Sequence, residues 1–197
     1  MSVLEPGLSV SAEVGVQLSD YRSDVVEIAA LRGRVRELEG IAAARGLSLP
    51  GLGRVVATGR WLTLSVRPER WLVLQTATLA GTRAAQWQTA CAGLGAVVDQ
   101  SSALTVLHLA GPMARELLAR SCRVDLHESS LPTGRVVATV MAQVAVIIAA
   151  IPSGMLVLTP ATTTRHFREW IIASGRVCGL LPQSVRGAIE MFGGSGS

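Results

Sequence analysis

The sequence predicts an α+β fold built from two ferredoxin-like βαββαβ units in tandem. An internal repeat is the first indication: Trp71-Leu72-Val73-Leu74 is matched, 84 positions later, by Met155-Leu156-Val157-Leu158. A second match lies upstream, where Arg36-Glu37-Leu38 corresponds to Arg115-Glu116-Leu117. Self-similarity over a long interval indicates a duplicated supersecondary unit. Each half also has the same order of apolar runs and helix-like segments, which is the split βαβ order.

The first unit is expected to span residues 23–100, after an N-terminal arm of residues 1–22. Residues 24–31 are β-branched and apolar, which is typical of a strand. A helix ended by Gly46 follows, because apolar residues then line one helical face: Val35, Leu38, Ile41 and Ala42. A hairpin of residues 61–66 and 71–75, with a polar turn at 67–70, precedes a helix at 82–92 and a strand at 96–98.

The second unit is expected to span residues 101–181. Residues 103–110 alternate as a strand should, with His108 on the same side as Leu104 and Val106. Gly111-Pro112 opens a helix whose buried face is predicted to hold Met113, Leu117 and Leu118. Strands at 144–150 and 155–159, a helix that starts at Thr162 or Thr163 and ends at Gly175, and a strand at 177–181 complete the unit. Residues 182–197 form a C-terminal extension and a flexible tail.

The composition predicts a folded chain with more apolar surface than a small monomer usually has. Of the 197 residues 49% are hydrophobic and 16% charged, and the mean hydropathy is +0.43. Such surface is buried in a membrane or against another protein. Residues 136–161 carry no charge, but Gln143, Pro152-Ser153-Gly154 and Pro160 interrupt them, so strands are expected there and no membrane helix.

Charge and cysteine usage restrict the partners and the compartment. The net charge is +4 and every basic residue except the histidines is Arg. These arginines are scattered, whereas nucleic-acid binding favours a clustered basic face. We therefore expect a protein partner with acidic patches and no nucleic acid. Three widely spaced cysteines without a C-x-x-C pair, and no recognisable signal peptide, predict a cytoplasmic chain without a zinc site.

Residue by residue, the chain predicts no catalytic, cofactor-binding or metal-binding site. His108 is interpreted as a core or interface histidine, and His166 lies on a helix surface without a second ligand at i+4. His127 follows Asp125 and precedes Ser129 and Ser130, but no G-x-S-x-G nucleophile turn exists. Two further candidates are interpreted as structural. Asp99 is assigned a turn-capping role, and Cys122 is an ordinary small residue despite the neighbouring Arg120 and Arg123.

Residues 97–118, which include Gly111-Pro112-Met113-Ala114-Arg115-Glu116-Leu117-Leu118, resemble the gamma subunit of heterotetrameric sarcosine oxidase. Residues 122–127, 131–136, 71–74 and 167–170 extend the resemblance, which covers about residues 21–175. The Gly-Pro-x-Ala-Arg-x-Leu-Leu core is shared with the wider glycine-cleavage T-protein and folate-binding superfamily. The fold implied by the resemblance is the N-terminal part of the T-protein fold.

The resemblance also implies a function. It implies a non-catalytic, structural subunit of a bacterial flavoenzyme that oxidises sarcosine, together with larger alpha and beta subunits and a small delta subunit. FAD and FMN are implied for beta, NAD and tetrahydrofolate for alpha, and zinc for delta, with no cofactor in this chain. No functional residue of the relatives carries over. The alternative is a stand-alone tetrahydrofolate-binding or aminomethyltransferase-like enzyme, with Asp99 as its acid–base candidate.

Overall fold

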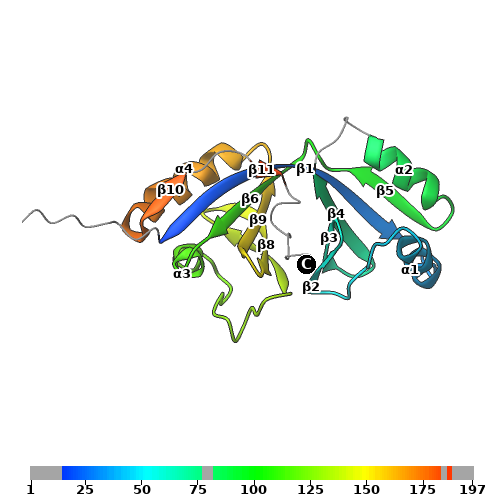
Figure 1. Cartoon of the computed structure of the whole chain (residues 1–197), viewed down its shortest axis with the longest axis horizontal. Coiled ribbons are helices and arrows are strands. Elements are labelled where there is room, and N and C mark those ends of the chain that lie inside the picture. The colour runs from blue at the N-terminus through cyan, green and yellow to red at the C-terminus, as the bar shows by residue number, and fades with distance from the viewer. Residues whose placement is uncertain (1–14, 77–81, 183–185, 188–197) are drawn as a thin grey trace, which may run out of the picture.

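The computed structural model describes residues 15–76, 82–182 and 186–187 (Figure 1). The elements of the first half are β1 (Val16–Ala30), α1 (Val35–Ala43), β2 (Arg54–Thr58), β3 (Trp61–Arg67), β4 (Arg70–Thr76), α2 (Thr82–Ala90) and β5 (Gly95–Asp99). Those of the second half are β6 (Leu104–Ala110), α3 (Ala114–Ala119), β7 (Val136–Met141), β8 (Val144–Ile151), β9 (Gly154–Pro160), α4 (Thr164–Gly175), the 3₁₀ helix η1 (Arg176–Cys178), β10 (Leu180–Pro182) and β11 (Arg186–Gly187).

The first half has the strand order of a ferredoxin-like unit, and the second half has the same order with one strand inserted, which confirms the predicted fold class. In the first sheet β3, β4, β1 and β5 lie in that order, and β2 is added beside β3. In the second sheet β8, β9 and β6 follow one another, with β7 added beside β8. Here β1 separates β6 from β10, so the second unit borrows a strand from the first.

The long strand β1 therefore belongs to both sheets. Its residues 16–22 pair with β6, β10 and β11, and its residues 23–30 pair with β4 and β5. The predicted arm of residues 1–22 is thus wrong from Val16 onward, while residues 1–14 lie outside the described part. Polar Gln17, Ser19 and Asp20 concealed this part of the strand. Its backbone pairs with β6 on one side and with β10 and β11 on the other, so its hydrogen bonds are satisfied whatever the side chains are.

Each unit contains one strand that the sequence did not predict. β2 is short and has an irregular burial pattern, so it lacks the alternation typical of a half-buried strand. β7 is joined to β8 by a two-residue turn, Ala142-Gln143, in which both residues have positive φ (45° and 65°). Glycine or asparagine usually marks such a turn. Without either residue, the stretch before β8 was interpreted as a loop.

The remaining predicted elements agree with the structure within a few residues. Gly46, with φ 70°, follows the turn that ends α1, and Pro152-Ser153 connects β8 to β9 as expected. The expected strand at 177–181 is instead η1 followed by β10, because Gly179 adopts a left-handed conformation between them. Residues 183–185 and 188–197 of the predicted extension lie outside the described residues.

The two sheets meet along β1 and diverge from it, with helices on their outer faces (Figure 1). Helices α1 and α2 cover the first sheet over a core that contains Trp61, Trp71 and Trp87. Helices α3 and α4 cover the second sheet over a core centred on Phe167. A third core lies between the sheets and takes residues from both, such as Leu64 and Leu156.

These three cores absorb most of the hydrophobic residues, so the expected apolar surface is largely internal. Among the described residues, the large apolar side chains that remain exposed are scattered: Leu31, Leu52, Val98, Val140 and Val177. The four-layered arrangement buries both faces of each sheet, which explains the high mean hydropathy. In the described part of the chain, no helix is long and apolar enough to cross a membrane.

Candidate functional site

His108 lies in the middle of β6 and is held by two neighbouring segments. Its Nδ1 is 3.2 Å from the hydroxyl of Tyr21, and its Nε2 is 3.1 Å from the carbonyl oxygen of Ser153. A tautomer with the proton on Nε2 satisfies both contacts, because Nε2 then donates to the carbonyl and Nδ1 accepts from the hydroxyl. His108 is 6% exposed, so it is a buried residue whose ring links β1, β6 and the β8–β9 turn.

The residues of the Ser-His-Asp arrangement lie together in the loop between α3 and β7, but not as a triad. One oxygen of Asp125 accepts the backbone N–H of His127 at 2.9 Å, and the other accepts the Ser130 hydroxyl at 2.5 Å. The His127 ring contacts Ser129 and not Asp125. A catalytic Asp would have to orient the imidazole ring. The cluster is therefore an exposed polar turn.

This turn makes the Asp125 carboxyl more acidic than usual. The Ser130 hydroxyl, followed by the His127 backbone N–H, holds the pKa of Asp125 below its ordinary value of 3.8. Because the folded-state pKa is depressed, the stabilisation is present above the unfolded-state pKa. It is lost as the pH falls through the folded-state pKa.

We expect Ser130→Ala to raise the pKa of Asp125, because it removes the largest stabilising contact of the carboxylate. An NMR titration of the Asp125 side-chain carboxyl measures this shift. Ser129→Ala is the matched control, since Ser129 bonds the imidazole of His127 and not Asp125. Equal pKa values in the wild type and in Ser130→Ala would contradict this account of the turn.

The other predicted candidates are dispersed over the molecule. Asp99 is exposed at the end of β5, where it accepts the backbone N–H of Ser101 at 2.9 Å, which is the expected turn-capping geometry. Cys122 is half-buried in an isolated bridge to Met141, and His166 is exposed on α4. Nowhere in the described ranges do three His, Cys, Asp or Glu side chains gather in a way that could hold a metal ion.

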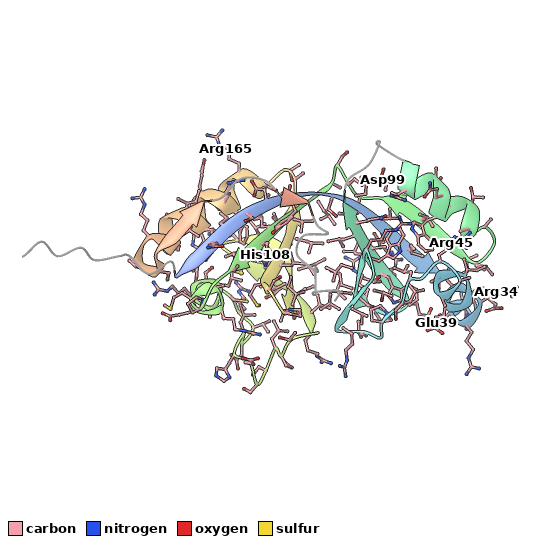
Figure 2. The ribbon with its side chains drawn as sticks, in the orientation of Figure 1. Arg34, Glu39, Arg45, Asp99, His108 and Arg165 are labelled. Atoms are coloured by element: carbon pink, nitrogen blue, oxygen red, sulfur yellow. The ribbon has the colours of Figure 1, made fainter. Side chains whose placement is uncertain are left out.

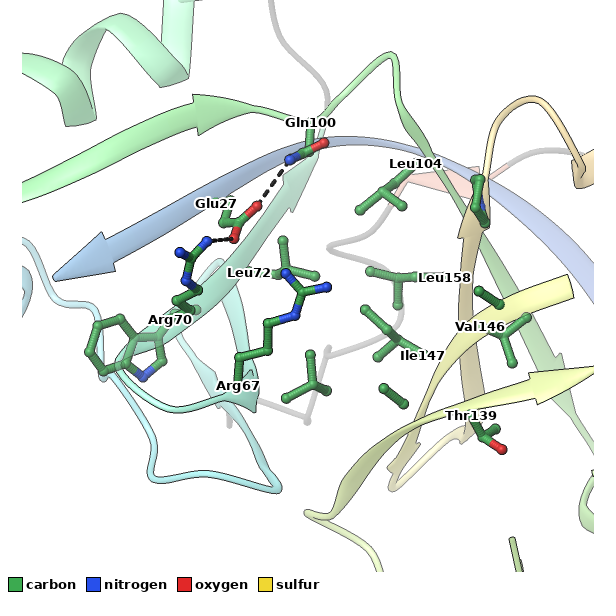
Figure 3. Close-up of a pocket in the computed structure, with 15 residues that line it drawn as sticks. Glu27, Arg67, Arg70, Leu72, Gln100, Leu104, Thr139, Val146, Ile147 and Leu158 are labelled. Carbon is green, nitrogen blue, oxygen red and sulfur yellow. Dashed lines mark hydrogen bonds and ion pairs between the residues drawn. The ribbon is translucent and has the colours of Figure 1, made fainter. Parts of the chain in front are cut away.

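A cavity of about 340 Å³ lies between the two sheets. Its apolar wall includes Leu72 from the first sheet and Ile147 and Leu158 from the second (Figure 3). Its polar end holds Glu27, whose two oxygens accept Arg70 at 3.2 Å and the Gln100 side-chain amide at 3.0 Å.

The charged side chains of this cavity are one ion pair and one arginine without a carboxylate partner among the described residues. Glu27 is already neutralised by Arg70. Arg67 extends from the end of β3 toward the cavity, and no carboxylate of the described residues pairs with it (Figure 3). The lining is thus suited to an apolar group that carries a negative charge. Asp99 is not part of this lining, so the acid–base candidate and the cavity are separate.

Sequence reasoning missed this cavity, since its walls come from strands far apart in the chain: β1, β3, β4, β6, β7, β8 and β9. Arg67 and Arg70 were interpreted only as turn residues. The isolated charge of Glu27 within an apolar strand was the one signal that could have indicated a polar contact there.

Comparison with known proteins places this fold in a family. The model of the sarcosine oxidase, gamma subunit family matches residues 38–171. The chain belongs to that family. A curated relative, sarcosine oxidase subunit gamma of Arthrobacter sp, is 32% identical over 138 residues, which are 67% of this chain and 66% of the relative. The resemblance stated from the sequence is therefore confirmed.

Two solved structures have folds similar to that of this gamma-family chain. A chain of the heterotetrameric sarcosine oxidase from Corynebacterium sp. U-96 is 26% identical, with a TM-score of 0.74 over 85% of this chain and 89% of that one. The aminomethyltransferase T of the glycine cleavage system from Bartonella henselae is 16% identical, with a TM-score of 0.65 over 91% of this chain and 50% of that one. The second match supports the predicted T-protein-like fold alone.

Proposed function

We propose that this chain is a structural subunit of a cytoplasmic, heterotetrameric flavoenzyme of the sarcosine oxidase type. The observation that carries the proposal is the match to a chain of a heterotetrameric sarcosine oxidase over 85% of the sequence, at 26% identity. The flavins, NAD, tetrahydrofolate and zinc belong to the alpha, beta and delta partner subunits. The role of this chain is to stabilise the assembly.

The placement of the polar candidates supports a structural role. His108 hydrogen-bonds Tyr21 and Ser153, and Asp125 accepts a hydrogen bond within its own turn. Each side chain therefore makes contacts that hold the fold together, and these contacts account for its position without a catalytic role. The alternative, a stand-alone tetrahydrofolate enzyme that uses Asp99, is not favoured. Asp99 is exposed and caps a turn outside the inter-sheet cavity.

A native purification through a tag on this chain tests the proposal. We expect large partner subunits to co-purify, with the absorbance spectrum of bound flavin and with sarcosine-dependent formation of hydrogen peroxide. The same purification from untagged cells is the control.

Two other outcomes would contradict the proposal. A lone, colourless chain would reject the subunit role. Saturable binding of tetrahydrofolate by that lone chain, weakened by Asp99→Asn, would establish the alternative enzyme.

A further inference from the structure

Three arginines surround two buried tryptophans on the helical side of the first sheet. Trp61 at the start of β3 and Trp87 on α2 meet edge to face, with ring centroids 5.9 Å apart. Arg60 and Arg83 lie 5.4 and 5.9 Å from the Trp61 ring, and Arg45 lies 6.0 Å from the Trp87 ring. With Gln86, these residues line a hollow of about 290 Å³, which we call the Arg–Trp hollow. Figure 2 shows Arg45 at this place, near α1 and α2.

The positive charge of the Arg–Trp hollow is not neutralised within the described part of the chain. Arg45 reaches only the Ile41 carbonyl, and Arg83 reaches only the Gln86 amide oxygen, each at 3.4 Å. The Nε of Arg83 is buried and has no hydrogen-bond partner. Five arginines outside the hollow are paired with carboxylates, namely Arg34, Arg70, Arg120, Arg165 and Arg168, whereas others among the described residues, such as Arg67, are not.

A buried donor without a partner and three converging like charges both raise the free energy of the folded chain. An anion in the Arg–Trp hollow removes both costs at once. Guanidinium groups stacked on aromatic rings keep their N–H edges free, and these edges match the two oxygens of a carboxylate.

The internal duplication shows that the fold does not require this cluster. At the offset of 84 positions, β4 and β9 correspond end to end. The same offset places apolar residues opposite the four residues of the cluster that lie on β3, its preceding turn and α2: Val144, Ala145, Phe167 and Ile171 opposite Arg60, Trp61, Arg83 and Trp87. The second unit therefore forms the same elements without any charge at these positions. The first unit therefore carries three arginines at a place where the second unit, with the same elements, has no counterpart charges on β8, its preceding turn and α4.

We propose that the Arg–Trp hollow binds an acidic segment of a partner subunit, with its Asp or Glu carboxylates between Arg60, Arg83 and Arg45. This inference rests on the proposed function, because it takes the chain to be a subunit. Tryptophan and arginine together are the residues that most often anchor protein interfaces. The net charge of +4 favours an acidic partner. The three arginines converge on one hollow, whereas nucleic-acid binding favours arginines spread over an extended basic face.

Charge reversal in the tagged, co-expressed complex tests this proposal. We expect Arg60→Glu/Arg83→Glu to lower the amount of partner subunits retained by at least about tenfold, as for the loss of a buried charge pair at an interface. Arg45→Glu, at an exposed position, should also lower the amount of partner subunits retained. This variant replaces the double variant in the test if the double variant does not fold. Circular dichroism and the thermal transition verify that each variant folds.

The matched control is Arg32→Glu/Arg36→Glu, which makes the same change in net charge at two exposed positions. Its retention of partners should stay within about twofold of the wild type, since neither arginine lines the Arg–Trp hollow and isolated exposed charges contribute little. A photo-crosslinker in place of Gln86 should then capture a partner peptide rich in Asp or Glu.

The outcomes separate the two proposals. Absence of partners from the wild-type purification would reject the proposed function. Wild-type assembly together with undiminished assembly of the Arg60→Glu/Arg83→Glu and Arg45→Glu variants would overturn the acidic-segment site alone. So would equal losses in the variants and the control. A saturable change in tryptophan fluorescence on titrating the full chain with inorganic phosphate, with normal assembly of the variants, would assign the Arg–Trp hollow to a free anion.

Discussion

Replacing Gly154 by alanine is expected to destabilise the chain by about 3 kcal/mol or more. Gly154 begins β9 with φ 135°, a conformation that alanine rarely adopts. A Cβ at this position would lie 2.3 Å from the carbonyl oxygen of Leu109, a backbone atom of the neighbouring strand β6. Relief of the contact requires β9 to move away from β6, which separates two central strands of the second sheet.

Urea denaturation of the purified chain at low concentration, followed by tryptophan fluorescence, measures this loss. Gly40→Ala is the matched control with the opposite sign. Gly40 lies within α1 and a Cβ there meets nothing within 4 Å, so alanine should stabilise the helix by about 0.5–1 kcal/mol. A Gly154→Ala variant as stable as the wild type would show that β6 and β9 are not held as described.

The second large effect is expected at Phe167, where Phe167→Ala should cost about 3–5 kcal/mol in the free energy of unfolding. The side chain is fully buried under α4 and its ring stacks near Trp170, with centroids 6.0 Å apart. It fills the core between the second sheet and its helices. Truncation therefore leaves a cavity between α4 and the second sheet, because the closely packed strands of that sheet cannot move to fill it.

The neighbouring His166 provides the control for Phe167. It is exposed on the same helix, so His166→Ala should change the free energy of unfolding by no more than about 0.5 kcal/mol. Phe167→Leu should lose less than Phe167→Ala, since leucine refills part of the volume. Similar transitions for Phe167→Ala and His166→Ala would contradict the packing of α4.

Both substitutions also bear on assembly, because they act on the second unit while the Arg–Trp hollow lies in the first. A variant that loses the packing of α4 should lose partners only in proportion to its unfolding. Charge reversal at Arg60 and Arg83 should lose partners from a folded chain. The two classes of variant thus distinguish a folding defect from a binding defect.

The offset between corresponding residues of the two halves changes along the chain, and the lengths of the loops explain the change. Strands β4 and β9 are related by an offset of 84 positions. The helices that follow these strands, α2 and α4, are related by the same offset to within a few residues. The upstream match has a smaller offset, because the loop 120–135 of the second half is longer than the loop 44–53 of the first. That longer loop contains Asp125 and His127, so the Ser-His-Asp residues lie in a segment that is extended relative to the first half, between elements that both halves share.

The sequence by itself determined the duplicated α+β architecture, the family, and the elements with strong local signals. Helix α1 and the β3–β4 hairpin were predicted because apolar spacing and turn residues act over a few positions. Only the tertiary structure decided that β1 serves both sheets, that β2 and β7 are strands, and that arginines from three separate segments converge on Trp61 and Trp87. These features depend on pairing and packing between residues far apart in the chain, and local periodicity carries no information about such contacts.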